Sequence, residues 1–255
     1  MKIIDFHTHY DRRQIGRNLM DEADFVPHLE RAGVAIACCF TMRGFFEDCR
    51  KHNDLLAERC RAHSDRLIPF ATVDPRLGAA AVEELERCLS NPLFRGVKFH
   101  PMQQRAPLSI VRDTMVELAR CAARHGVPMI FHDGTPPWAS TFQVAAVARW
   151  VPEATIVLGH SGLADYVLPA AQLARDLPNL HACYCSTRTG DLECLVETAG
   201  ADKVLFGSDF GDGSWKVLAE RIDSVRESRL DDAAKEKVFR RNAERLLHLK
   251  ERPLA

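Results

Sequence analysis

Short apolar runs alternate with amphipathic segments along this chain. The runs are rich in β-branched and aromatic residues, as strands are, while the segments between them place apolar residues three and four positions apart, as helices do. Eight runs have the strand pattern, at residues 2–7, 35–40, 66–73, 95–100, 127–132, 154–160, 180–185 and 203–209. Helical spacing is clearest over residues 54–65, 79–90 and 115–126. The pattern therefore predicts a chain of repeated strand–helix units.

The number of units indicates the fold class. Eight units in 255 residues predict an α/β fold, a single-domain (β/α)8 TIM barrel spanning residues 1–255, because such barrels take about 250 residues. An open, doubly wound parallel sheet and a division into two small domains are the alternatives. The last amphipathic segment, residues 231–249, is expected to form a C-terminal helix packed outside the barrel.

Composition and charge narrow the class of partner. The chain is 46% hydrophobic and 27% charged, which is enough to build a large core, and its net charge is -1. Such a balance gives no field that attracts nucleic acid or an anionic membrane, so we expect a small-molecule substrate. Apolar residues left over on outer helices could form a homodimer.

Two further patterns bear on the cellular compartment. No apolar run reaches the roughly 18 residues that a membrane span needs, and the chain opens on a predicted strand without room for a signal peptide. We therefore expect a cytoplasmic protein. The nine cysteines are scattered and form no CxxC pair, so we interpret them as small buried apolar side chains rather than disulfides or zinc ligands.

Ionisable residues gather where the predicted strands end. The carboxyl ends of parallel barrel strands meet at one rim, where catalytic side chains collect. Six candidates fall at that rim: His7, His9, His100, His132, His160 and Asp209. Each alone is more simply interpreted as a hydrogen-bonded histidine or a turn-capping aspartate. Independent structural needs would not place all six at one end, so the set predicts an active site.

Four of these residues are suited to hold a divalent metal: His7, His9, His132 and Asp209. Imidazole and carboxylate are ligands that Zn²⁺ prefers, and His7 and His9 share one face of a strand. We expect one Zn²⁺, with Mn²⁺ or another divalent ion as the alternative, and an open position for a water whose pKa falls towards about 7. Asp209 could also move a proton, and His160 could bind that water or polarise an oxyanion.

Seven stretches together resemble a known family. They are "DFHTHY", "DRLIPFATVDP", "RGVKFHP", "FHDG", "LGHSG", "LFGSDF" and "NAERLL". As a set they are similar to the amidohydrolase superfamily, in particular its amidohydrolase family 2 branch, which includes aminocarboxymuconate semialdehyde decarboxylase, benzoate-type decarboxylases and many hydrolases. The resemblance implies a distorted (β/α)8 barrel, the same four metal ligands, and His160 acting in catalysis or on a second metal.

Predicted strand four raises the question of one metal or two. Some members of the superfamily bridge two metals with a carboxylated lysine at the end of this strand. Here Lys98 and His100 share a face, so with His100 at the rim Lys98 would lie one layer deeper, too deep to bridge. We therefore expect one metal, with Lys98 carboxylated or paired with an acid such as Asp209, and His100 in contact with substrate or water.

Substrate-facing residues are sought in the segments that follow the strands. Arg43 and Arg105 could each bind a substrate carboxylate through two hydrogen bonds, and a solvated loop arginine is the alternative for both. Tyr184 and Ser186 end the seventh strand and are expected to line the pocket. Trp138 lies on a loop that could cover it.

Two activities fit this set of residues. The first is hydrolysis of a small lactone, amide or ester by a metal-activated water, with Asp209 passing the proton to the leaving group. The alternative is metal-dependent, non-oxidative decarboxylation of a small unsaturated or aromatic acid. Decarboxylases of the branch tend to be longer, so the compact chain favours hydrolysis. A catalytically silent metal-binding barrel is the third interpretation, but structural zinc is usually fully ligated by protein, and here His100 and His160 are left for other work.

Overall fold

Strands and helices alternate in the predicted order. The structure, a computed structural model, describes residues 1–10, 22–163, 165–188, 190–211, 214–251 and 253–254. The strands are β1 (Ile3–His9), β2 (Val34–Phe40), β3 (Leu67–Pro69), β4 (Val97–Phe99), β5 (Met129–Phe131), β6 (Ile156–Leu158), β7 (Leu180–Tyr184) and β8 (Val204–Phe206). The helices between them are α1 (Phe25–Ala32), α2 (Cys49–Arg61), α3 (Ala79–Leu89), α4 (Arg112–Arg124), α5 (Thr141–Trp150), α6 (Val167–Asp176) and α7 (Asp191–Ala199), and α8 (Trp215–Arg226) follows β8.

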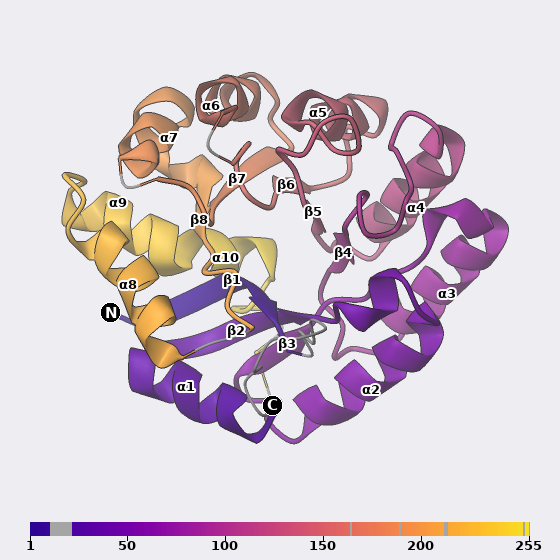
Figure 1. The fold of residues 1–255 in the computed structure, drawn as a ribbon, viewed down its shortest axis with the longest axis horizontal. Helices are drawn as coiled ribbons and strands as arrows, with labels where there is room; N and C mark the ends of the chain where they lie inside the picture. Colours follow the sequence, from indigo (N-terminus) through magenta and orange to yellow (C-terminus); the bar gives the residue numbers. More distant parts are fainter. Residues whose placement is uncertain (11–21, 164, 189, 212–213, 252, 255) are drawn as a thin grey trace.

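Two parallel ladders form the barrel wall, with the helices around it (Figure 1). One ladder has the order β1-β2-β3 and the other β4-β5-β6-β7-β8. Single bridges join them, Ala71 to Val97 at one junction and Thr8 to Phe210 at the other. β3 ends on Pro69, which has no N–H to donate, so the first junction is made beyond it by Ala71. The wall is closed but irregular, and the predicted (β/α)8 barrel is confirmed.

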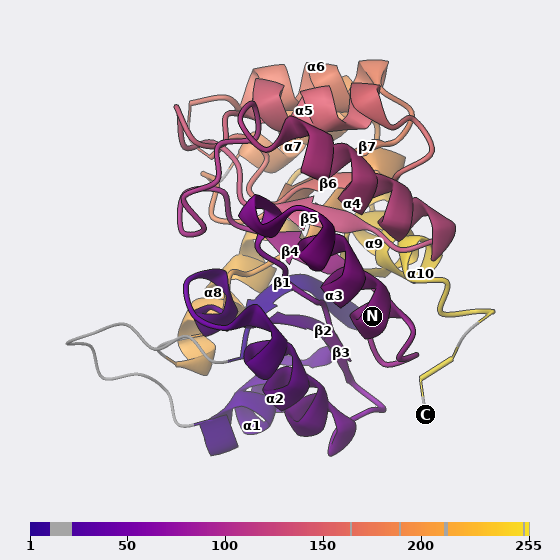
Figure 2. The same cartoon turned by 90° about the vertical axis from the view of Figure 1, so that its right-hand side faces the viewer.

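Buried side chains separate into layers inside and outside the wall. The interior layer includes Ile4, Phe6, Phe40, Ile130 and Leu205. Side chains of opposite parity on the same strands pack outwards against the helices, which the side view shows surrounding the strands (Figure 2). The nine cysteines are free, and eight are buried, as expected of small apolar side chains.

A β-bulge in β1 decides which way its histidines point. Ile4 and Phe6 face the interior while Ile3 faces the helices, so unbroken alternation would turn residue 7 outwards. The pairing with β2 instead advances from Asp5–Ala37 to Thr8–Cys39, which is three residues on β1 against two on β2. The extra residue reverses the parity, so His7 and His9 lie against Phe40 on the inside.

The C-terminal segment forms three consecutive helical pieces rather than one regular helix. These are α9 (Asp232–Glu236), a π-helical turn over Lys237–Arg241, and α10 (Asn242–Leu246). The Asn242 amide donates to the carbonyls of Ala201 and Val204 at the start of β8. Leu246 and Leu247 join the interior layer, so this segment closes the amino end of the barrel. Among the described residues, no helix has both the length and the apolar character to cross a membrane.

Candidate metal and active site

His7 is held in one orientation and one tautomer. Its Nδ1 lies 2.9 Å from the carbonyl oxygen of Gly159 and donates to it, which leaves the lone pair on Nε2. The ring fits because residue 159 is a glycine: a Cβ there would lie 2.4 Å from the Phe131 oxygen and 3.2 Å from Cε1 of His7. Nε2 is therefore available to an ion or a donor at the barrel mouth.

Asp209 brings the last strand to the first. Its backbone N–H donates to the His7 carbonyl over 2.9 Å, with the residue at φ 59°, a left-handed conformation that aspartate tolerates. Its Oδ1 lies 2.9 Å from Nε2 of His9 and 3.5 Å from Nε2 of His7, and the Ser186 hydroxyl donates to Oδ2 over 3.4 Å. One potential ligand atom from each of His7, His9 and Asp209 falls within 4.8 Å of the others.

Three more rim histidines complete a continuous cluster of rings. The His160 ring lies 4.7 Å from that of His7 and 4.6 Å from that of His132, which stacks on His100 at 3.9 Å. Nε2 of His132 and Nδ1 of His160 are buried without a hydrogen-bond partner in the structure. Buried polar atoms are normally satisfied, so these two nitrogens within the cluster are available to a ligand. The structure thus brings together all six predicted rim residues.

Lys98 reaches further than the sequence predicted. It lies one layer below His100, as expected, but its extended side chain places Nζ 3.0 Å from Nε2 of His7. Four methylene groups span the difference between layers, so the Lys98 ammonium reaches a predicted metal ligand, while the expectation that it does not bridge two metals stays a prediction. A metal and the Lys98 ammonium would compete for the same imidazole lone pair.

Burial sets the protonation of the cluster. Desolvation and the nearby Lys98 lower the pKa of His7 and of His100 well below the usual value, and desolvation lowers that of His160 to about 4. Burial raises the pKa of Asp209, but the hydrogen bond from His9 and the surrounding imidazoles outweigh it and hold this pKa well below its usual range. Neutral imidazoles beside an ionised carboxylate form a donor set ready for a cation.

Two buried aspartates outside the predicted set hold the rim in place. Asp5 accepts from the backbone N–H groups of His7 and Ser208 and from the Ser208 hydroxyl, and so ties β1 to β8. Asp133 accepts from the backbone N–H groups of His160 and Gly162, each over 2.7 Å. Asp5 lies in the stretch "DFHTHY" and Asp133 in "FHDG". Their closeness in sequence to His7 and His132 could have indicated a role at the rim.

Two predicted substrate residues have partners of their own outside the cluster. Tyr184 packs in the layer between the wall and α8, with its hydroxyl donating to Ser224, because Cys183 and Cys185 take the interior parity of β7. The expectation that Tyr184 lines the pocket needs correction, and Ser186 is the residue from this strand end that reaches Asp209. Arg43, 39% exposed, forms a two-bonded ion pair with Glu47, one helical turn on.

Comparison with known proteins tests the predicted resemblance. The family model for amidohydrolases matches residues 4–249. The chain belongs to the amidohydrolase family. The gamma-resorcylate decarboxylases of Rhizobium sp. (strain MTP-10005) and Rhizobium radiobacter are each 25% identical to it, over 81% and 80% of this chain and 78% and 76% of theirs.

Solved structures of family members share the fold. The 2,6-dihydroxybenzoate decarboxylase from Rhizobium superposes with a TM-score of 0.76 and 20% identity, covering 98% of this chain and 99% of that one. A 5-carboxyvanillate decarboxylase from Novosphingobium aromaticivorans, complexed with manganese, gives a TM-score of 0.76 and 14% identity over 97% and 96% of the two chains. The barrel of this amidohydrolase is therefore of the same architecture.

The donor set of this amidohydrolase fits a divalent metal. His7, His9 and Asp209 converge, and Nε2 of His132 and Nδ1 of His160 have no hydrogen-bond partner among the described residues. Imidazole with one carboxylate suits Zn²⁺, Mn²⁺ and similar ions. Cys185 also lies within 4.8 Å of ring nitrogens of His7 and His160, a proximity that strand parity alone did not indicate.

Proposed function

We propose that this protein is a metal-dependent decarboxylase of a small aromatic acid. The proposal is carried by the convergence of His7, His9 and Asp209 beside the two unpartnered nitrogens of His132 and His160. The choice of reaction is supported by two relatives that are gamma-resorcylate decarboxylases. Each of them matches most of this chain's length. Hydrolysis, the first expectation from the sequence, has less support than this alternative.

His7, His9, His132 and Asp209 are the residues that would hold the metal. When bound, a divalent ion there would act as a Lewis acid on the substrate's oxygens and fix their position. Mn²⁺ and Zn²⁺ both fit the donor set, and manganese accompanies one of the similar decarboxylase structures. His160, neutral at physiological pH because burial lowers its pKa to about 4, is placed to hydrogen-bond a substrate oxygen through Nδ1.

Asp209 is the group best placed to deliver the proton. Decarboxylation breaks the bond between the ring and the carboxyl carbon, releases carbon dioxide, and puts one proton on the ring carbon. The Asp209 side chain is 22% exposed while His7 and His9 are buried, so it connects solvent with the buried cluster. We infer that Asp209, ionised in the free site, takes up a proton from water and passes it on to the ring carbon, with Ser186 donating to its second oxygen.

Product analysis tests the proposal. The purified protein, loaded with Mn²⁺ or Zn²⁺, is incubated in D₂O with 2,6-dihydroxybenzoate, 5-carboxyvanillate and a panel of simple lactones, amides and esters. The expected result is carbon dioxide from an aromatic acid, with one deuterium on the ring carbon that lost the carboxyl group. Hydrolysis of a lactone, amide or ester without release of carbon dioxide would contradict the proposal and support the hydrolase hypothesis instead.

A further inference from the structure

A second group of potential metal ligands lies on the outer wall of the barrel, between α3 and α4. Within the described residues it is the one such group that shares no member with the rim cluster: Glu86 of α3, with Cys121 and His125 at the end of α4. One oxygen of Glu86 lies 2.7 Å from Nε2 of His125, and the other lies 3.2 Å from Sγ of Cys121. We propose that these three side chains bind a zinc ion.

Local structure preorganises the three ligands. Cys121 and His125 are four positions apart, so they lie one above the other on the same face of α4. The backbone N–H of His125 donates to the Cys121 carbonyl over 3.2 Å, which keeps the last turn of α4 helical up to the histidine. Glu86 enters from the neighbouring helix and already contacts both residues. The ligand atoms therefore need no change of backbone to surround one ion.

The chemistry of the set favours zinc. Thiolate, imidazole and carboxylate in a three-ligand arrangement are typical of Zn²⁺, with water at the fourth position, and ligand atoms around such an ion stand roughly 3–4 Å apart. The observed separations of 2.7 and 3.2 Å are those of hydrogen bonds. Placing one Zn²⁺ where the two shared protons lie requires a small outward shift of Glu86. The Cys121 thiol proton leaves to solvent, and His125 frees its Nε2 lone pair by carrying its ring proton on Nδ1.

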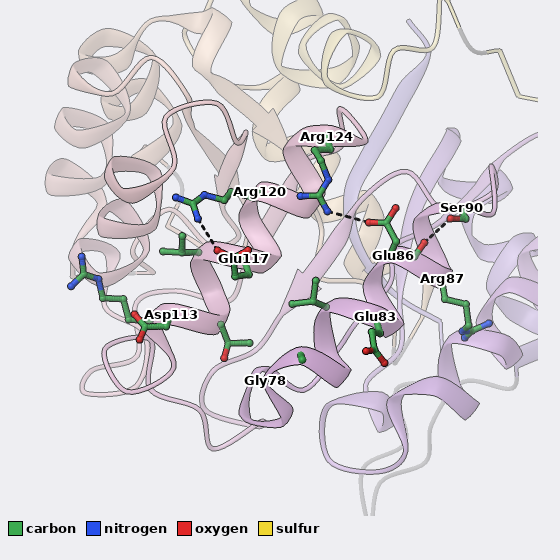
Figure 3. A pocket seen from close by; sticks show the side chains of 14 residues that line it. Gly78, Glu83, Glu86, Arg87, Ser90, Asp113, Glu117, Arg120 and Arg124 are labelled. Atoms are coloured by element: carbon green, nitrogen blue, oxygen red, sulfur yellow. Dashed lines mark hydrogen bonds and ion pairs between the residues drawn. The ribbon is translucent and has the colours of Figure 1, made fainter.

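Access is available from a groove between α3 and α4 of about 1230 Å³. Glu86 and Arg124 line it and face each other across the two helices (Figure 3). Arg124 lies 3.3 Å from Glu86, but it is 60% exposed and can move into solvent when an ion takes its place. Cys121 is buried and in contact with Glu86, while His125 is 24% exposed. Of the three ligands Glu86 alone lines the groove, so an ion from the groove would meet Glu86 first.

Cobalt spectroscopy tests the site, because Co²⁺ bound to thiolate gives a charge-transfer absorption that nitrogen and oxygen ligands do not. Metal-depleted full-length protein is titrated with Co²⁺ as wild type, Cys121→Ser and Cys185→Ala, the last variant removing the thiol near the barrel site. We expect the absorption in wild type and Cys185→Ala and its loss in Cys121→Ser. Absence from wild type, or persistence in Cys121→Ser with loss in Cys185→Ala, would overturn the proposal.

A second comparison avoids the buried cysteine, whose replacement could disturb folding. Glu86→Gln keeps the size of an exposed side chain but removes the charge, and Glu83→Gln makes the same change one turn earlier in the same groove. Zinc affinity, measured by competition with a chromophoric chelator, should fall roughly tenfold or more in Glu86→Gln. It should be unchanged in Glu83→Gln. Equal affinities in the two variants would contradict the assignment of Glu86 as a ligand.

Discussion

One imidazole, that of His7, carries several constraints at once. Its Nδ1 is occupied by the Gly159 carbonyl, its Nε2 faces Lys98 and Asp209, and its edge lies against Gly159 itself. A ring fixed on one nitrogen can offer the other to an ion without a loss of orientation, which is how metal-binding histidines are commonly prepared. Substitutions at this site can therefore separate its chemistry from its packing.

Asp209→Asn should separate proton transfer from metal binding. Asparagine keeps the shape and an oxygen for His9, so the fold should persist, while the loss of the titratable group should lower kcat by about 10²- to 10⁴-fold. His7→Ala should in addition release the metal, because it removes a ligand. Metal content and kcat of both variants, measured beside thermal unfolding, check this. Full activity in Asp209→Asn would exclude the proton-transfer role.

Gly159→Ala should destabilise the protein through packing alone. The new methyl group would meet the Phe131 oxygen at 2.4 Å, and such overpacking costs about 1–3 kcal/mol. Gly200→Ala is the control for metal binding alone: a Cβ there meets nothing within 4 Å, although its φ of 90° also strains an alanine. Urea unfolding should show a loss of this size for Gly159→Ala, together with weaker metal binding that Gly200→Ala does not share.

In each barrel strand, the alternation of side chains decides which residues point into the barrel and which pack against the helices. On β5 and β4 the interior side chains just before the rim are Ile130 and Lys98, and the rim histidines follow two residues later. β7 shows the same rule at its start, where His181 points into the barrel near Lys203 and Arg245 rather than towards the rim. A histidine buried at this end, away from the rim cluster, is kept neutral by its surroundings.

His181 should make stability depend on pH. Burial, with Lys203 and Arg245 nearby, lowers its pKa to about 3, whereas in the unfolded chain it is about 6.5. The unfolded state therefore binds the proton more readily, so this contribution is present above about pH 6.5 and is lost as the pH falls towards 3. Between about pH 7 and 4.5 the loss should be roughly 2–3 kcal/mol.

Replacing the buried His181 ring tests the predicted loss of stability at low pH. Urea unfolding at both pH values should show a smaller loss of stability in His181→Gln than in wild type. His63→Gln, at a half-buried histidine just after α2, should behave as wild type. An identical pH dependence in wild type and His181→Gln would show that other groups govern acid unfolding.

For the whole molecule, the sequence pattern predicted the barrel wall and the position of the rim residues, but not the local irregularities of the strands. The eight units, the rim position of six ionisable residues and the face shared by Lys98 and His100 follow from strand period and parallel topology. The bulge at residues 5–8 does not, because nothing in "IIDFHTH" marks an inserted residue. Tyr184 was misplaced because Tyr184 and Ser186 were expected to share a strand face, whereas Ser186 lies beyond the strand at φ 58°, where alternation no longer applies.

Metal removal should act on the stability of the entire barrel. An ion that binds the folded state alone stabilises it by about 2.7 kcal/mol at a free concentration of about 100 Kd. Chelation should therefore lower the unfolding free energy of Mn²⁺-loaded protein by a few kcal/mol, reversibly. Mn²⁺ is chosen because a thiolate-containing outer site favours softer ions. His7→Ala should not respond to Mn²⁺; an equal response would place the stabilising ion elsewhere.

The pairing of His9 with Asp209 joins residues 200 positions apart. During synthesis at about 5–20 residues per second, roughly 10–40 s separate the emergence of the two. An incomplete chain therefore contains His7 and His9 without the Asp209 carboxylate, the last of the proposed metal ligands. The complete ligand set proposed above forms only after the final strand has left the ribosome, so a chain interrupted before residue 209 would lack its carboxylate ligand.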